Sequence, residues 1–202
     1  GDIGNTSAQY AKTFFETLPF DAITVAPYMG KDSIDPFLAY QNKWTIVLGL
    51  TSNPGSQNFE QQKLATGQYL YESVLEQVAS WGSPEQLMFV VGATRSEDIS
   101  KIRKLAPNHF FLVPGVGAQG GSLEEVVKYG MTDECGLLVN SSRGIIYADQ
   151  SENFAVEAKK EALKIFNNNV VFIDDIKDNL FDFPKKQIVC TKYEFSKPYD
   201  II

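Results

Sequence analysis

The chain has 202 residues, 44% of them hydrophobic and 21% charged, with a formal net charge of −7 at pH 7. This length and apolar content suffice for one well-buried domain and exclude a disordered chain. The acidic balance argues against a nucleic-acid or anionic-membrane partner, because polyanions attract basic surfaces. No apolar stretch of the sequence approaches the length of a membrane span.

Taken in chain order, apolar runs of strand length alternate with segments of helical periodicity, which indicates βαβ units and a parallel sheet. Thr6 or Ser7 is the expected N-cap of the first helix. The expected strands are residues 20–25, 44–50, 87–91, 110–113 and 137–139. The expected helices are residues 7–18, 32–40, 61–81, 96–105, 122–129 and 155–166.

The two ends of the chain do not fit this alternation. The opening residues 1–6 lack a Met and resemble the end of a strand, so we expect a segment before Gly1. From Asn167 the pattern stops, and the apolar runs at 170–173 and 187–191 could add strands or pack as a tail. We therefore divide the chain into a barrel-like portion, 1–166, and an unassigned C-terminal segment, 167–202.

Loops rich in Gly, Ser, Thr, Asn and Pro follow the C-terminal ends of the expected strands. A (β/α)₈ barrel gathers its chemistry on this rim, and a doubly wound open sheet also binds ligands there, so periodicity leaves both architectures open. His109, the single histidine, precedes a strand and would lie at the opposite rim, where it could not act as a catalytic base.

The residue types present also limit the chemistry. One histidine and two cysteines, Cys135 and Cys190, cannot supply a Ser/His/Asp set, a disulfide framework or a metal site of recognisable spacing. We expect a cytoplasmic protein without a metal, whose chemistry rests on lysine, aspartate and hydrogen bonds or is absent.

Two consecutive strand ends suit a phosphate. Residues 110–113 stop at Pro114 and lead into four glycines within seven residues, where bare backbone can approach an anion and Gln119 can reach it. The next strand ends in Asn140, Ser141, Ser142 and Arg143. Free N–H groups and a guanidinium fork bind phosphate oxygens well, and we prefer this interpretation to a structural turn or a surface ion pair.

Other polar groups are less specific. Thr51 and Ser52 begin a turn-forming cluster, TSNPGS, on the same rim, and a capped turn is as good an interpretation as a ligand donor. Asp2 lies beside Thr6 in a Gly-Asp-Ile-Gly context, although a lone aspartate is usually a cap.

Six segments in this order and spacing resemble orotidine 5′-phosphate decarboxylase, in its longer bacterial branch, over about residues 1–166. They are GDIGNT, DAITVAPYMGKDS, TSNPGS, FVVGAT, FLVPGVGAQGG and NSSRGIIYA. The resemblance implies a homodimeric (β/α)₈ TIM barrel with shared active sites. Such an enzyme converts orotidine 5′-monophosphate to uridine 5′-monophosphate (UMP) in pyrimidine biosynthesis, with no metal or organic cofactor.

The resemblance also implies roles for individual residues. Asp2 corresponds to the last aspartate of the family's Asp-x-Lys-x-x-Asp run, which enters the partner's catalytic site, and Thr6 accompanies it. Ser52, or Thr51 if the register differs, would contact the pyrimidine, and Pro114 would wall its pocket. The phosphate ligands would be Gln119 and Arg143, completed by backbone near Gly117, Gly120, Ser142 and Gly144.

The chain departs from the family at its start, since the catalytic lysine, its partner aspartate and about three of the eight strands would lie before Gly1. Residues 1–202 alone are therefore expected to be inactive. Two alternatives remain from the residues themselves. One is another phosphate-binding (β/α)₈ enzyme, such as a sugar-phosphate epimerase or decarboxylase. The other is a non-catalytic fragment that binds a nucleotide phosphate.

Overall fold

Six parallel strands form one sheet in the computed structural model, which describes residues 2–92, 96–116, 121–166 and 171–173. The sheet order is β1-β2-β3-β4-β5-β6, so every strand pairs with its neighbour in the sequence. The strands are β1 (Ala22–Val25), β2 (Trp44–Leu50), β3 (Leu87–Val91), β4 (Phe110–Pro114), β5 (Leu137–Asn140) and β6 (Val171–Ile173).

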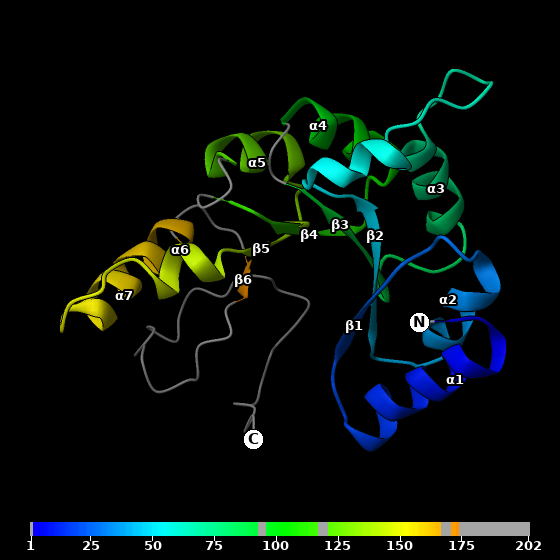
Figure 1. The fold of residues 1–202 in the computed structure, drawn as a ribbon, viewed down its shortest axis with the longest axis horizontal. Helices are drawn as coiled ribbons and strands as arrows, with labels where there is room; N and C mark the ends of the chain where they lie inside the picture. The colour runs from blue at the N-terminus through cyan, green and yellow to red at the C-terminus, as the bar shows by residue number, and fades with distance from the viewer. Residues whose placement is uncertain (1, 93–95, 117–120, 167–170, 174–202) are drawn as a thin grey trace.

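Helices connect these strands and lie along the outside of the curved sheet (Figure 1). The α-helices are α1 (Gly4–Lys12), α2 (Lys31–Leu38), α3 (Leu70–Ala79), α4 (Ser96–Leu105), α5 (Leu123–Gly130), α6 (Ser142–Ile146) and α7 (Phe154–Phe166). A π-helical turn, η1 (Thr13–Thr17), extends α1, and a 3₁₀ turn, η2 (Pro54–Asn58), follows β2.

This arrangement decides between the two architectures that periodicity left open. A doubly wound sheet reverses its strand order at a switch point and carries helices on both faces, whereas a (β/α)₈ barrel keeps sequential order with helices outside. The described strands follow the barrel rule throughout. The fold is thus an incomplete (β/α)₈ barrel, as the sequence predicts.

The two faces of the sheet have separate apolar clusters, because successive side chains of a strand point to opposite faces. The outer face packs against the helices through fully buried residues such as Val47, Phe89 and Phe111. The inner face carries a second cluster centred on Met88 and Val90. Both faces of β3 are therefore buried, which explains its unbroken apolar sequence.

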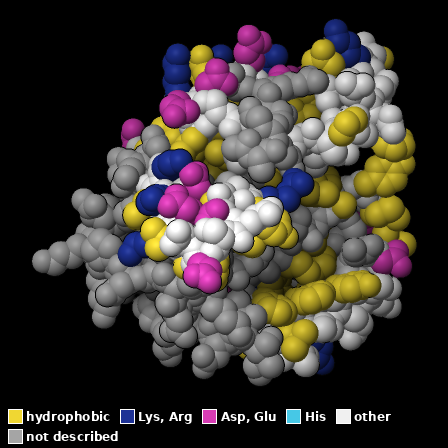
Figure 2. Space-filling view, turned by 60° about the vertical axis from the view of Figure 1, so that its left-hand side comes forward, with side chains coloured by type: hydrophobic (Ala, Val, Ile, Leu, Met, Phe, Trp, Pro, Cys, Tyr) yellow, Lys and Arg dark blue, Asp and Glu magenta, His cyan; other side chains and the backbone are white. Residues whose placement is uncertain are grey.

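The surface shows mixed charge. In Figure 2, lysine and acidic side chains interleave mainly at the upper left of the face, and hydrophobic side chains gather at its right and lower right. On α7, opposite charges form pairs such as Lys160 with Glu157, 2.5 Å apart. Among the described helices, none combines the length and apolar character that crossing a bilayer requires.

Two sequence-based expectations need correction. The helix expected over 61–81 is shorter, because the backbone turns at Gly67, which adopts φ +86°, and α3 begins only at Leu70. In this turn the Leu64 N–H donates to the Gln68 carbonyl and the Gly67 N–H donates to the Leu64 carbonyl. The first helix begins at Gly4, ahead of the expected caps, and Ser7 instead donates to the Asp2 carbonyl. Pattern analysis missed the short α6 and left open whether 170–173 adds a strand, and β6 makes the described sheet six-stranded.

Candidate functional site

The two ends of the loop after β4 lie close together. Gly115 has φ +88°, a conformation that favours glycine, and Val116 forms a parallel bridge with Gly121. The loop therefore begins and ends at the same point of the sheet edge. Gly117, Gln119 and Gly120, the predicted phosphate-binding residues of this loop, lie outside the described residues.

The end of β5 is attached to this same loop. The buried Ser141 hydroxyl donates to the Val116 carbonyl at 3.1 Å, which joins the two strand ends that the sequence pairs as a phosphate site. Gly144 packs so close that a Cβ there would lie 2.9 Å from Ser141 Oγ. Ser142 donates to Asn140 Oδ1 at 3.2 Å at the start of α6.

Arg143 is exposed beside this junction, and it forms no ion pair with any residue that the structure describes. The surface salt bridge that would have explained this arginine is therefore absent from the described part of the chain. A guanidinium held next to backbone N–H groups and two serines can bind the oxygens of a phosphate in a bidentate fork.

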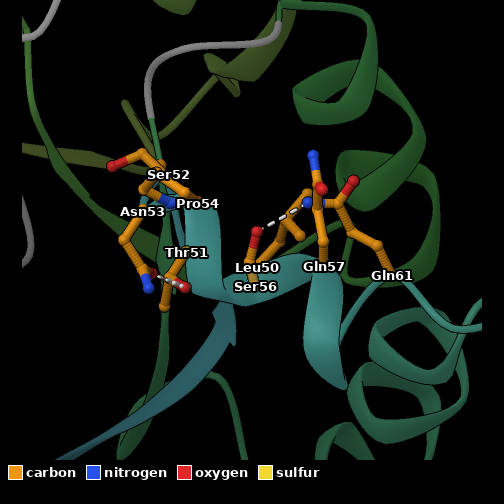
Figure 3. Close-up of a pocket in the computed structure, with 9 residues that line it drawn as sticks. Leu50, Thr51, Ser52, Asn53, Pro54, Ser56, Gln57 and Gln61 are labelled. Carbon is orange, nitrogen blue, oxygen red and sulfur yellow. Dashed lines mark hydrogen bonds between the residues drawn. The ribbon is translucent and has the colours of Figure 1, made fainter.

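The loop after β2 encloses a cavity of about 190 Å³ (Figure 3). Ser52 and Asn53 lie on one side of it, and Gln57 and Gln61 lie on the other. The Gln61 amide donates to the buried Ser56 hydroxyl at 2.6 Å, which holds η2 against the following segment. The lining is largely amide and hydroxyl, so it suits a polar, uncharged ligand group such as the edge of a base.

Thr51 and Ser52, which the sequence could not tell apart, differ in their surroundings. The Thr51 hydroxyl lies 2.6 Å from Asn53 Oδ1 and 2.8 Å from Glu60 Oε1. Ser52 packs against the end of β3, where a Cβ on Gly92 would come within 2.8 Å of the Ser52 Cβ.

Pro114 ends β4 and pairs with Asn140 of β5. The alternation of β4 places Pro114 on the same face as Phe110 and Leu112, which belong to the inner cluster. The predicted wall of the base pocket thus lies at the rim on the inner face of the sheet.

Asp2 and Thr6 lie apart from these elements, exposed at the N-terminal end of α1. The Asp2 carboxylate accepts a hydrogen bond from the Ile3 N–H at 2.8 Å. With the described residues, Asp2 and Thr6 form hydrogen bonds only within α1 and the residues just before it. The structure therefore brings the β4 and β5 ends together and leaves these two residues facing outward.

Displaced pKa values occur at the opposite end of the sheet. Burial lowers the pKa of Arg103 to about 10. Burial, and then the charge of Arg103, lower the pKa of His109, which precedes β4 and is only 6% exposed. His109 thus lies away from the loops, as expected. The described residues include no cluster of His, Cys, Asp and Glu that could hold a metal ion.

The sequence assigned no role to two residues that shape the rim, Glu60 and Gly92. Ser141 stood within a recognised motif, so its position was available although its contact with Val116 was not. Glu60 lies just before the helix expected over 61–81, and the sequence assigned it no role. The contact between Glu60 and Thr51 closes the loop after β2. Apolar periodicity does not predict such a contact.

Comparison with known proteins gives a consistent result. Residues 1–158 match the model of the "Orotidine 5'-phosphate decarboxylase / HUMPS family". An orotidine 5′-phosphate decarboxylase of Bacteroides fragilis is 60% identical over 165 residues, which cover 82% of this chain and 60% of the relative. One from Christiangramia forsetii is 62% identical, covering 81% of this chain and 61% of the relative.

Solved structures agree with the sequence relatives. The structure of Leishmania donovani OMP decarboxylase matches with a TM-score of 0.72 and 36% identity, covering 83% of this chain and 65% of that one. The chain thus spans about 60% of the length of the curated relatives it matches.

Proposed function

Because this chain belongs to the orotidine 5′-phosphate decarboxylase family, we propose that its protein converts orotidine 5′-monophosphate to UMP in pyrimidine biosynthesis. The observation that carries this proposal is the Ser141–Val116 hydrogen bond. It joins the two strand ends expected to bind the phosphate, and leaves Arg143 exposed beside them.

The residues of this chain would bind the substrate at both ends. Arg143, Gln119 and the backbone near Gly117, Gly120, Ser142 and Gly144 would hold the phosphate. Ser52 would contact the pyrimidine, and Pro114 would wall its pocket. Binding energy from the phosphate, which is remote from the reacting carbon, then stabilises the transition state.

The proposed reaction needs neither a metal nor an organic cofactor. The bond from the pyrimidine ring to its carboxylate breaks, carbon dioxide leaves, and the electron pair stays on the ring carbon. By the family resemblance, the lysine of an Asp-x-Lys-x-x-Asp run stabilises this carbanion electrostatically and protonates it. Asp2, as the last aspartate of that run, would act in the site of a neighbouring subunit.

A cytoplasmic homodimer with shared sites is part of this proposal. Asp2, just before α1, and Thr6, in its first turn, are exposed, so a second subunit can contact them. Exposed aromatic residues offer an apolar contact near the rim: Tyr28 is 78% exposed and Phe59 is 61% exposed, with ring centroids 6.0 Å apart. Aromatic side chains of this kind are enriched at protein interfaces.

Calorimetric titration with UMP tests the phosphate assignment. Arg143→Ala should weaken UMP binding by about 2–3 kcal/mol, because a bidentate charged contact is lost. Lys101→Ala, which removes a positive charge from the exposed face of α4, is the control and should leave the affinity unchanged. Equal UMP affinity in wild type and Arg143→Ala would remove Arg143 from the site.

Subunit exchange tests the shared sites. Mixing Asp2→Ala with Arg143→Ala in the full protein should restore up to about a quarter of the wild-type activity. In each mixed dimer one site would combine an intact Arg143 with an intact Asp2 from the other subunit. If each subunit used its own Asp2, both sites would stay defective and mixing would restore nothing.

A further inference from the structure

We propose that Glu60 is a positioning residue for base recognition: it holds Thr51 so that Ser52, the next residue, faces the ligand. This inference rests on the proposed function, in which the loop after β2 contacts the pyrimidine. In this proposal Ser52 contacts the pyrimidine, and Thr51 anchors the loop to Glu60.

The Glu60 carboxylate binds Thr51 at two points. One oxygen accepts the Thr51 backbone N–H at 2.7 Å, and the other lies 2.8 Å from the Thr51 hydroxyl. A carboxylate that accepts from backbone and side chain of one residue fixes both its position and its rotamer. Thr51 is therefore oriented toward Glu60.

The Thr51 hydroxyl has a second neighbour, Asn53 Oδ1, at 2.6 Å (Figure 3). A hydroxyl carries one proton, so it can donate to only one of these acceptors. If the hydroxyl donates to Glu60, flipping the Asn53 side-chain amide lets its NH₂ group donate to the Thr51 hydroxyl oxygen. The side chains of Asn53, Thr51 and Glu60 then form a continuous chain of hydrogen bonds within the loop.

Glu60 is itself fixed by the buried part of the fold. Its backbone carbonyl accepts from the N–H of Tyr71, a residue of the first turn of α3 that is only 3% exposed. The backbone of Glu60 is thus tied to α3, while its carboxylate contacts Thr51 just after the end of β2.

Gly92 limits Ser52 from the other side. A Cβ at position 92 would lie 2.8 Å from the Ser52 Cβ and 2.9 Å from its backbone nitrogen, so only glycine leaves room. The Gly92 N–H also donates to the Leu50 carbonyl at 2.8 Å. Ser52 therefore lies between a packed backbone at β3 and a residue that Glu60 holds.

Calorimetry with two probes tests the proposal. UMP reports on base and phosphate together, and ribose 5-phosphate reports on the phosphate end alone. Glu60→Ala should raise the Kd for UMP about tenfold, equivalent to about 1.4 kcal/mol, and leave the Kd for ribose 5-phosphate unchanged. Glu60→Asp, which keeps the charge but is one methylene shorter, should have the same selective effect.

Two further variants complete the series. Glu60→Gln keeps an oxygen for the Thr51 N–H and an amide that can donate to the hydroxyl, so its UMP affinity should stay within about threefold of wild type. Glu76→Ala removes an exposed glutamate of α3 that accepts a hydrogen bond from Gln68 at 2.9 Å, and should change neither affinity.

Amide hydrogen exchange of Thr51 in the ligand-free protein gives a readout that needs no nucleotide. Exchange should accelerate by about tenfold or more in Glu60→Ala and stay slow in Glu60→Gln. Unchanged exchange, or equal losses of UMP and ribose 5-phosphate affinity, would overturn the positioning role. Failure of the wild-type protein to bind UMP would instead overturn the proposed function.

Discussion

Arg103 and Arg143 carry the same side chain at opposite ends of one sheet. Arg103, at the end where the strands begin, donates to the carbonyls of Gly130 at 2.8 Å and His109 at 2.6 Å, and its guanidinium lies 3.6 Å from the Phe111 ring centroid. It also donates to Ala106, Pro107 and Gly136. Arg143, at the other end, is exposed and pairs with none of the described carboxylates.

The contrast shows how one chemical group serves two purposes. At the base of the sheet, the guanidinium satisfies carbonyls at the ends of α4 and α5 that would otherwise lack partners. At the rim, the same fork forms no ion pair with the described residues, as its proposed role in binding a phosphate requires. Substitution of Arg103 should therefore lower stability and leave UMP binding unchanged, whereas substitution of Arg143 should weaken UMP binding and leave stability almost unchanged.

The largest expected effect concerns catalysis at the rim: the 202-residue polypeptide alone should not decarboxylate orotidylate. The reaction needs a lysine beside the departing carboxylate, and residues 1–202 contain no Asp-x-Lys-x-x-Asp run. Lys31 instead pairs with Asp35 at 2.6 Å, and Lys43 donates to the Phe20 carbonyl at 2.6 Å.

The loss of orotidylate absorbance measures this directly, with and without a segment carrying that run fused ahead of Gly1. Appreciable turnover by residues 1–202 alone would mean that the proton donor is a different group.

Breaking the base of the sheet should cost stability instead. Arg103→Met keeps much of the side-chain volume but leaves several carbonyls without donors. We expect the free energy of unfolding to fall by about 3 kcal/mol, measured by urea denaturation. UMP affinity of the folded protein should not change.

Arg143→Met is the matched control, since the same substitution at the rim should change stability by less than about 0.5 kcal/mol. Similar losses of stability in both variants would contradict the division between the two ends.

A smaller effect should appear on mild acidification. His109 is buried with neither ring nitrogen hydrogen-bonded within the described residues, and its pKa is lowered by burial and by Arg103, while Glu85 acts in the opposite direction. Below about pH 6.5, His109 therefore binds a proton in the unfolded chain but stays neutral in the folded chain. Stability should be full above this pH and fall below it, by up to about 1.4 kcal/mol per pH unit.

The chain has a single histidine, so His109→Gln should flatten the dependence of stability on pH between about 5.5 and 7. An unchanged slope in this variant would assign the titration to another group.

Much of the fold was predictable because the five longer strands are apolar runs that end in turn-forming residues. Phe110 to Pro114 and Leu137 to Asn140 lie within a residue of their expected bounds. The helix over 61–81 was wrong because apolar periodicity continues through Leu64, whereas the backbone turns at Gly67. At five and three residues, α6 and β6 are too short to show a period.

The candidate site could be predicted only where its chemistry is local. Arg143 and the glycines after Pro114 predict an anion site from a few residues of sequence, and this role is part of the proposal. The hydrogen bond from Ser141 to Val116 and the hold of Glu60 on Thr51 depend on how separate segments pack. Gln119 and its neighbouring glycines stay predictions.

The sequential order of the strands also bears on how the chain acquires its structure. Each described strand pairs with its neighbour in the sequence, so pairing among the described strands needs no partner from a more distant part of the chain. Pairing with the nearest strand in the sequence costs less loop-closure entropy than pairing with a more distant strand would. During synthesis the sheet can therefore grow by one strand at a time, with the most recent strand serving as the template for the next.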